Sequence, residues 1–230
     1  MIGSESGLVL VSTWIQTVVK AVQPSLIESI KSHAVLLFGL LAAMWLVEVV
    51  DFVLPFSELD RFGIRPRRVD GLMGIPLSPF LHVGFGHLVS NSVPFLMLGG
   101  WVMFGGRKVF LSVSAWVVLV GGAGVWLLGR AGTVHLGASG LIFGYLGFLL
   151  SRGVFDRSIG WVMVSGGVLI LYGGMIYGVL PGDPRVSWLG HSCGFLAGIA
   201  GAWLMFPRGG KLFDHGNPRQ GVGDGSSGEL

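Results

Sequence analysis

The chain has 230 residues, of which 52% are hydrophobic and only 12% are charged, whereas soluble domains carry about 25% charged residues. This composition, with a mean hydropathy of +0.74, excludes an ordinary soluble domain and predicts an integral membrane protein. The 40 glycines suit membrane helices that pack backbone to backbone. The net charge of +3 indicates no particular partner, because membrane topology explains basic residues in loops.

Residues 1–32 are predicted to form an N-terminal arm. Their apolar stretch, 8–22, is interrupted by polar residues, and we expect Pro24 to break any helix there. A signal peptide has a basic start, whereas the first basic residue here is Lys20. An amphipathic arm lying on the membrane is the favoured interpretation, with disorder as the alternative.

Residues 33–206 are predicted to form an all-α membrane domain with six spans, each able to cross a hydrocarbon core of about 30 Å. The apolar runs are about 34–54, 86–104, 109–128, 139–151, 158–179 and 188–206. A long polar and basic loop follows the first run. The tail 207–230 is rich in Gly, Ser and Asp, which predicts disorder.

Loop charges predict the orientation. If the N-terminus is cytoplasmic, the inner segments hold nine basic residues and the outer segments hold six, four of them in the long first loop. This distribution favours a cytoplasmic N-terminus. The second, fourth and sixth spans then begin on the outer side.

The outer ends of these three spans carry polar side chains. His87 and Asn91 belong to the second span, Ser139 to the fourth and His191 to the sixth. His87 and Asn91 are four residues apart, so they share one helix face. We expect the four side chains to converge at one depth, where an ionisable group inside a membrane is a candidate functional residue.

The fourth span has only 13 residues from Ser139 to Arg152, or about 20 Å of helix. We therefore expect it to begin below the outer surface, after an irregular segment at 130–138 that lines a water-filled cavity. Ser139 would lie on the cavity floor at a helix N-terminus. Free N–H groups and the helix dipole there stabilise a developing oxyanion.

The glycine spacing predicts that the fourth and sixth helices approach closely. The residues are Gly140 and Gly144 in one helix, and Gly190, Gly194 and Gly198 in the other. A serine hydroxyl needs a base to become a good nucleophile, and histidine titrates near neutrality. We therefore predict a Ser139–His191 dyad. Because the topology brings no carboxylate to this pair, we expect packing to orient the imidazole.

Three sequence blocks resemble the rhomboid intramembrane serine proteases: PFLHVGFGHLVSN at 79–91, GASG at 137–140, and Gly190-His191 followed by Gly194 and Gly198. The resemblance covers about residues 33–206 and implies a six-span rhomboid-like bundle with a long first loop, in which Ser139 is the nucleophile and His191 the general base. It further implies an oxyanion hole from His87, Asn91 and the backbone N–H groups of Ser139 and Ala138. His82 would be structural, and Phe143 would stack on His191.

The function implied is an endopeptidase that cuts peptide bonds in or near transmembrane segments of membrane proteins through an acyl-enzyme. Its partners would be transmembrane-helix substrates and membrane lipids, in the plasma membrane with the active site open to the outer face. The sequence contains no cofactor, metal or nucleic-acid signature. Two alternatives are a catalytically silent rhomboid-like protein that binds membrane clients, and a small transporter. For His135 a filler role in the loop is the favoured interpretation, with contact to lipid headgroups or a place in the cavity lining as the alternatives.

Overall fold

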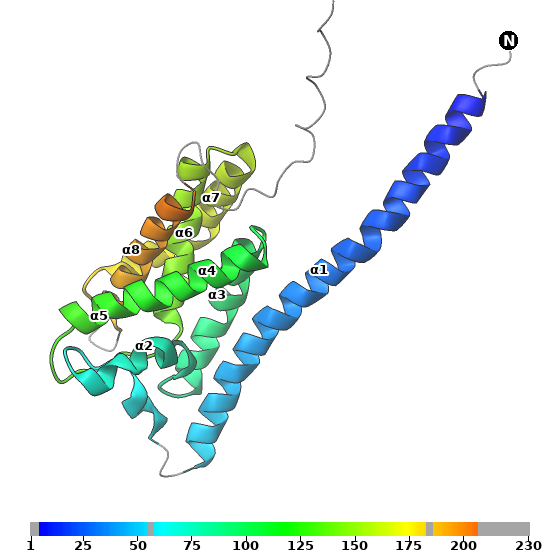
Figure 1. Ribbon diagram of the computed structural model, residues 1–230. Coiled ribbons are helices and arrows are strands. Elements are labelled where there is room, and N and C mark those ends of the chain that lie inside the picture. The colour runs from blue at the N-terminus through cyan, green and yellow to red at the C-terminus, as the bar shows by residue number, and fades with distance from the viewer. Residues whose placement is uncertain (1–4, 55–57, 183–185, 207–230) are drawn as a thin grey trace, which may run out of the picture.

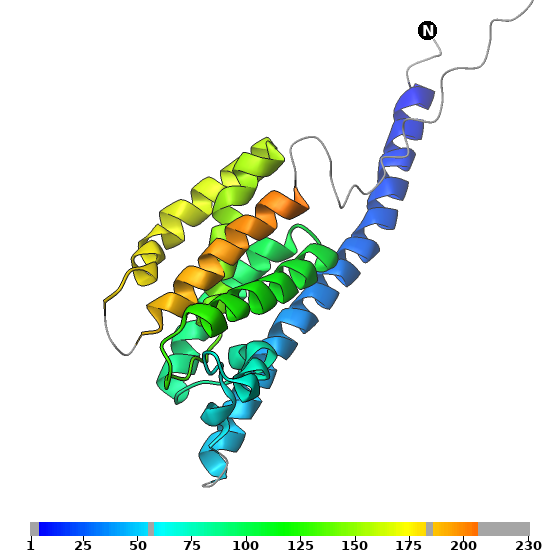
Figure 2. The ribbon, with the colours of Figure 1, turned by 60° about the vertical axis from the view of Figure 1, so that its left-hand side comes forward.

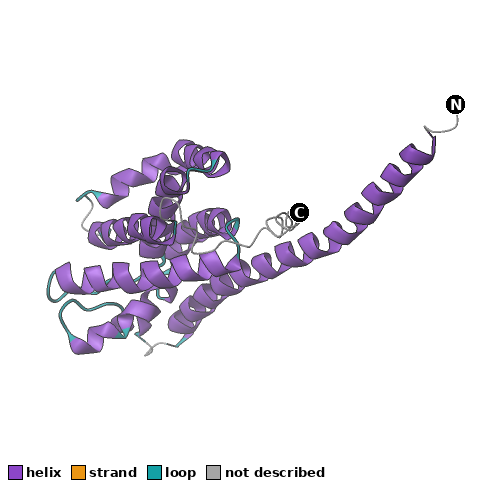
Figure 3. Cartoon of the chain, turned by 45° about the horizontal axis from the view of Figure 1, so that its top comes forward, coloured by secondary structure: helices purple, strands orange, loops and turns teal. Residues whose placement is uncertain are grey.

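The structure, a computed structural model, describes residues 5–54, 58–182 and 186–206, with side chains from residue 27 onward. Within these residues the chain consists of helices joined by loops (Figures 1 and 3), with one isolated β-bridge between Ile64 and His135. The elements are α1 (Glu5–Val53), η1 (Leu59–Phe62), η2 (Val69–Leu72), α2 (Gly74–Leu77), η3 (Ser78–Phe80), α3 (Phe85–Met103), α4 (Arg107–Trp116), the π-helical turn η4 (Val117–Gly121), α5 (Gly122–Leu128), α6 (Ser139–Asp156), α7 (Ile159–Tyr172), η5 (Gly173–Val179) and α8 (Trp188–Met205).

Each apolar run of the sequence coincides with a helix or a series of helical segments. Three of these are long and apolar enough to cross a membrane on their own: Ile27–Val53, Arg107–Leu128 and Ile159–Val179. A fourth qualifies if α3 is joined to the segment Val69–Phe80, from which it is bent by 68°. The protein is thus an all-α membrane protein, and the count of six spans stays a prediction.

The helix break expected at Pro24 is wrong, whereas the boundary between the arm and the membrane domain at residues 32 and 33 stays a prediction. Helix α1 runs without interruption for 49 residues from Glu5, past Pro24, and extends beyond the bundle (Figures 1 and 2). A proline removes one helical hydrogen bond, which the helix on either side of it tolerates here. The amphipathic face expected of the arm depends on side chains that lie outside the described residues. The tail 207–230 lies outside them as well.

Helix α6 is longer than its hydropathy predicts. It continues for 18 residues to Asp156, or about 27 Å, because Arg152 does not end it. The Arg152 side chain is buried, with the residue 4% exposed. Its guanidinium lies 3.4 Å from the centroid of the Trp161 ring and 4.0 Å from that of Phe206, and its Nε lies 3.7 Å from the Asp156 carboxylate. Cation–π contacts and the nearby carboxylate offset the cost of burying the charge.

Helix α6 lies at the centre of the bundle and packs most extensively on α8; the two lie side by side in Figures 1 and 2. A Cβ built on Gly194 would overlap the carbonyl oxygen of Gly140, and one on Gly198 would overlap that of Gly144. The backbones are therefore in direct contact at two successive turns. This confirms the close approach predicted from glycine spacing.

Two polar contacts join this pair to the helix Arg107–Leu128. The Trp116 indole N–H donates to the carbonyl oxygen of Ala197 in α8 (2.9 Å). The hydroxyls of Ser114 and Tyr145 are 2.7 Å apart and join α4 to α6. Buried polar groups are costly without a partner, so these contacts fix how the helices meet.

A pair of Gly→Ala substitutions tests the backbone contact. In Gly198→Ala the new methyl group meets the Gly144 carbonyl and lies 2.8 Å from the Phe148 nitrogen, so we expect the free energy of unfolding to fall by about 2 kcal/mol. The matched control is Gly166→Ala in α7, where nothing lies within 4 Å of the added Cβ. It should leave stability unchanged or slightly raised. Thermal unfolding in detergent measures both, and equal shifts would contradict the packing described.

Candidate active site

The four polar side chains singled out in the sequence meet in space. His87 and Asn91 from α3, Ser139 from α6 and His191 from α8 all line one cavity of about 740 Å³. Ser139 is the first residue of α6, and the other three lie in the first two turns of their helices. The predicted convergence of these helix ends is therefore confirmed as geometry.

Ser139 follows an irregular segment, as predicted for residues 130–138, while its depth below the outer surface stays a prediction. The backbone N–H of Gly137 donates to the Ser78 carbonyl oxygen (2.8 Å), and His135 and Ile64 exchange two backbone hydrogen bonds of 2.9 and 2.8 Å. Gly137 has a φ of +109°, a conformation that favours glycine. A Cβ there would also lie 2.5 Å from the His87 ring. The nucleophile candidate is thus presented by a firmly tied loop.

Ala138 does not fit the oxyanion role that the resemblance implies. Its N–H donates to Nε2 of His82 (3.3 Å), and Ala138 is absent from the lining of the cavity. One N–H cannot serve the cavity while it donates to a buried imidazole. The same contact supports the structural role expected of His82, whose ring also lies edge-on to His87 at 5.2 Å between centroids.

His191 is held on two sides. Its ring stacks on Phe143, with centroids 4.1 Å apart and planes inclined by 10°, which confirms the predicted stacking. Its Nδ1 lies 2.9 Å from the carbonyl oxygen of Gly178. A carbonyl only accepts, so we assign the proton to Nδ1, which leaves Nε2 as the basic nitrogen.

The Gly178 contact had no counterpart in the sequence analysis. Every residue has a backbone carbonyl, so sequence gives no signal for one that orients a histidine. The glycine itself is needed, because a Cβ at this position would lie 2.7 Å from Cζ of Phe143. A neutral backbone carbonyl, and not a carboxylate, orients the imidazole here.

Asn91 offers a free donor at the cavity. The residue is 6% exposed, and its Nδ2 has no hydrogen-bond partner within the described part of the chain. A buried amide without a partner costs about 1–3 kcal/mol. Such a donor is suited to a ligand oxygen that enters the cavity.

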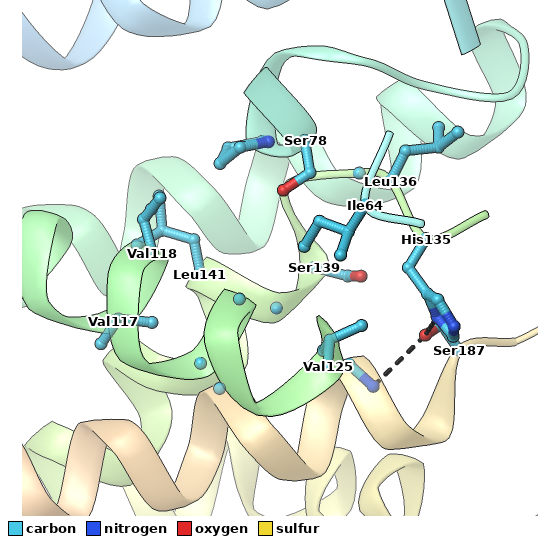
Figure 4. A pocket seen from close by; sticks show the side chains of 17 residues that line it. Ile64, Ser78, Val117, Val118, Val125, His135, Leu136, Ser139, Leu141 and Ser187 are labelled. Carbon is cyan, nitrogen blue, oxygen red and sulfur yellow. Dashed lines mark hydrogen bonds between the residues drawn. The ribbon is translucent and has the colours of Figure 1, made fainter. Parts of the chain in front are cut away.

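His135 is more than loop filler, and the alternative that it lines the cavity is confirmed. It lines the cavity with Ser139, and its Nδ1 lies 2.7 Å from Oγ of Ser187. His135 and Ser187 also line a neighbouring cavity of about 640 Å³. A smaller cavity of about 50 Å³, shown in Figure 4, has Ser78, Ser139, His135 and Ser187 among its lining residues. The nucleophile candidate therefore borders space that is large enough for water and is lined in part by polar side chains.

The described residues contain no group of three or more His, Cys, Asp or Glu side chains arranged to hold a metal ion. The polar side-chain groups that the cavity offers are three serine hydroxyls, three imidazoles and an amide. Together they can supply a nucleophile, a base and hydrogen-bond donors.

The half-buried His135 gives a prediction for stability. Burial lowers the pKa of His135 from its ordinary value of 6.5, so the unfolded chain takes up this proton at a higher pH than the folded protein does. The stability gained by burying the neutral imidazole of His135 is complete above about pH 6.5 and is lost as the pH falls toward the folded-state pKa. The melting temperature in detergent should drop between about pH 7 and about pH 5 by less in His135→Gln than in the wild type. An identical drop would contradict this assignment.

Comparison with known proteins adds a family. The family model described as the Rhomboid domain matches residues 70–208. An uncharacterised protein of Mycobacterium leprae is 43% identical over 173 residues, which cover 72% of this chain and 68% of that protein. One of Mycobacterium tuberculosis is also 43% identical, over 71% of each chain. YdcA of Bacillus subtilis, described as a candidate rhomboid protease, is 38% identical over 80 residues, or 34% of this chain and 40% of its own.

Proposed function

Since the chain belongs to the rhomboid family, we propose that it is an intramembrane serine endopeptidase that cuts peptide bonds in or near transmembrane segments of membrane proteins. One observation carries the proposal: Ser139, His191, His87 and Asn91, from three helices far apart in sequence, line one cavity. The description of YdcA supports the same class of reaction.

In the proposed reaction the Ser139 Oγ attacks the carbonyl carbon of the substrate, and its proton passes to Nε2 of His191. The Nδ1–H of His191 donates to Gly178, which keeps Nε2 unprotonated in the resting enzyme. Stacking on Phe143 holds the ring plane while the charge on the imidazole changes. The base is thus oriented by a carbonyl and an aromatic face.

The tetrahedral intermediate carries a negative oxygen that needs preorganised donors. We assign this role to Nδ2 of Asn91, which lacks a partner, to the His87 ring, and to the N–H of Ser139. The last is one of the first N–H groups of α6, which have no partner within the helix. Ala138 is left out because its N–H is bound to His82.

Collapse of the intermediate breaks the C–N bond. The His191 imidazolium gives its proton to the leaving amine, and the acyl group stays on Ser139 as an ester. A water then attacks this ester and gives a proton to His191. When the second tetrahedral intermediate collapses, the ester C–O bond breaks, Oγ of Ser139 takes that proton back from His191, and the second product leaves as a carboxylic acid. The residues of this cavity suffice for the cycle.

The proposal includes six spans, a cytoplasmic N-terminus and a cavity that opens to the outer face of the plasma membrane. The support is the excess of basic residues in the inner segments and the common position of the α3, α6 and α8 N-termini around one cavity. The substrates are then transmembrane helices whose scissile bond lies near the outer leaflet.

Labelling by a serine-directed fluorophosphonate tests the dyad. We expect a single adduct on Ser139, no adduct in Ser139→Ala, and a labelling rate in His191→Ala lower by about 10³ or more, since serine without its base is a poor nucleophile. Ser151→Ala is the matched control: it removes another hydroxyl of α6, which donates to the Gly147 carbonyl (2.6 Å). Labelling that persists in Ser139→Ala would contradict the proposal.

The substrate must unwind locally, because a helix hides its carbonyl groups in intrahelical hydrogen bonds. Replacing glycines near the cut by leucines in a model transmembrane substrate should slow its cleavage, by up to about tenfold for each glycine replaced. Gel-based cleavage of the wild-type and leucine-rich substrates in the same vesicles measures this. Unchanged rates would show that local unwinding does not limit the reaction.

A further inference from the structure

A chain of hydrogen bonds runs from the loop before Ser139 to the first turn of α8. Oγ of Thr133 lies 2.7 Å from the Arg130 carbonyl oxygen and 2.9 Å from Nε2 of His135. Nδ1 of His135 lies 2.7 Å from Oγ of Ser187. Oγ of Ser187 then accepts from the N–H of Gly190 at 3.2 Å. All four contacts lie outside the residues used in the mechanism.

The Arg130 carbonyl oxygen at one end of this series of hydrogen bonds determines which group donates in each of them. The Arg130 carbonyl accepts, so Thr133 gives it its only hydroxyl proton and must accept from Nε2–H of His135. The neutral imidazole then has a bare Nδ1, which accepts from the Ser187 hydroxyl. Ser187 keeps its lone pairs for the Gly190 N–H. One tautomer of neutral His135 satisfies every member.

The two ends of this chain differ in how they are held. The segment of His135 is fixed by its backbone pairing with Ile64 and by the Gly137–Ser78 bond. Ser187, in contrast, is the N-cap of α8, and its carbonyl oxygen also accepts from the N–H of His191 at 3.1 Å. The His135 ring therefore ties the start of the base-bearing helix to the loop that presents the nucleophile.

His135 and Ser187 lie at the same sequence distance from the two proposed catalytic residues. His135 precedes Ser139 by four residues, and Ser187 precedes His191 by four residues. Resting on the function proposed above, we propose that His135 and Ser187 form a positioning pair that holds the imidazole of His191 in register with the hydroxyl of Ser139. Neither residue exchanges a proton with the substrate; the pair acts through the first turn of α8.

Kinetics of a double-mutant cycle test the pair. One hydrogen bond is worth up to about a tenfold change in an equilibrium, so we expect His135→Ala and Ser187→Ala each to lower kcat by about tenfold. KM should stay nearly unchanged, and the double variant should lose no more than either single one. Ser32→Ala, which removes an exposed hydroxyl bonded to the Ser29 carbonyl (2.9 Å), is the matched control for serine loss.

His135→Gln is the rescue variant. Its amide can accept from Ser187 and donate to Thr133, so kcat should recover most of the loss seen in His135→Ala. A rise in KM at constant kcat would instead make the pair a substrate contact and overturn the proposal. Independent, multiplicative losses in the double variant would overturn it as well.

Hydrogen exchange gives a readout that needs no catalysis and is measured in the Ser139→Ala background. The amides of Gly190 and His191 should exchange up to about tenfold faster in His135→Ala and return to the parent rate in His135→Gln. Unchanged exchange would overturn the positioning pair, whereas failure of the proposed function would show only in the labelling of Ser139. The melting temperature of each variant confirms that it is folded.

Discussion

The contact of two bare helix backbones holds this structure together. Where α6 and α8 cross, the hydrogen of Gly194 faces the carbonyl oxygen of Gly140, and one turn deeper Gly198 faces Gly144. In a membrane no hydrophobic effect drives helices together, so close van der Waals packing must do so. As a result, Ser139 at the start of α6 and His191 in the first turn of α8 line the same cavity. A larger residue at Gly194 or Gly198 separates the two helices.

Polar contacts around the cavity add to the packing of the glycines. His82 holds the Ala138 N–H, Gly178 holds Nδ1 of His191, and His135 meets Ser187. Each contact joins two different segments of the chain, and each uses neutral partners. Because a charge in this region would be costly, neutral hydrogen bonds suit the task of orienting a base and a nucleophile. Among the groups that line the cavity, Asn91 keeps a donor in reserve, which we assign to the reaction.

The sequence predicted those features that depend on residue type and spacing. Glycines four apart indicated the crossing of α6 and α8, and the apolar runs indicated the helices. The positions of Ser139 and His191 at helix ends followed from the same patterns. What it missed depends on tertiary contacts: Arg152 lies within α6 because Trp161 and Phe206 cover its guanidinium, and the carbonyl of Gly178 has no sequence signature. Ala138 was assigned from the family motif, whereas its N–H is already used by His82.

The central claim is that the hydroxyl of Ser139 and the imidazole of His191 face each other in one water-accessible cavity. A serine-acylating reagent that carries a short alkylating arm tests it directly, with peptide mapping by mass spectrometry. The account predicts one product in which the peptides of Ser139 and His191 are joined through the reagent. An adduct on Ser139 whose arm is captured by a different residue, or only hydrolysed, would contradict it.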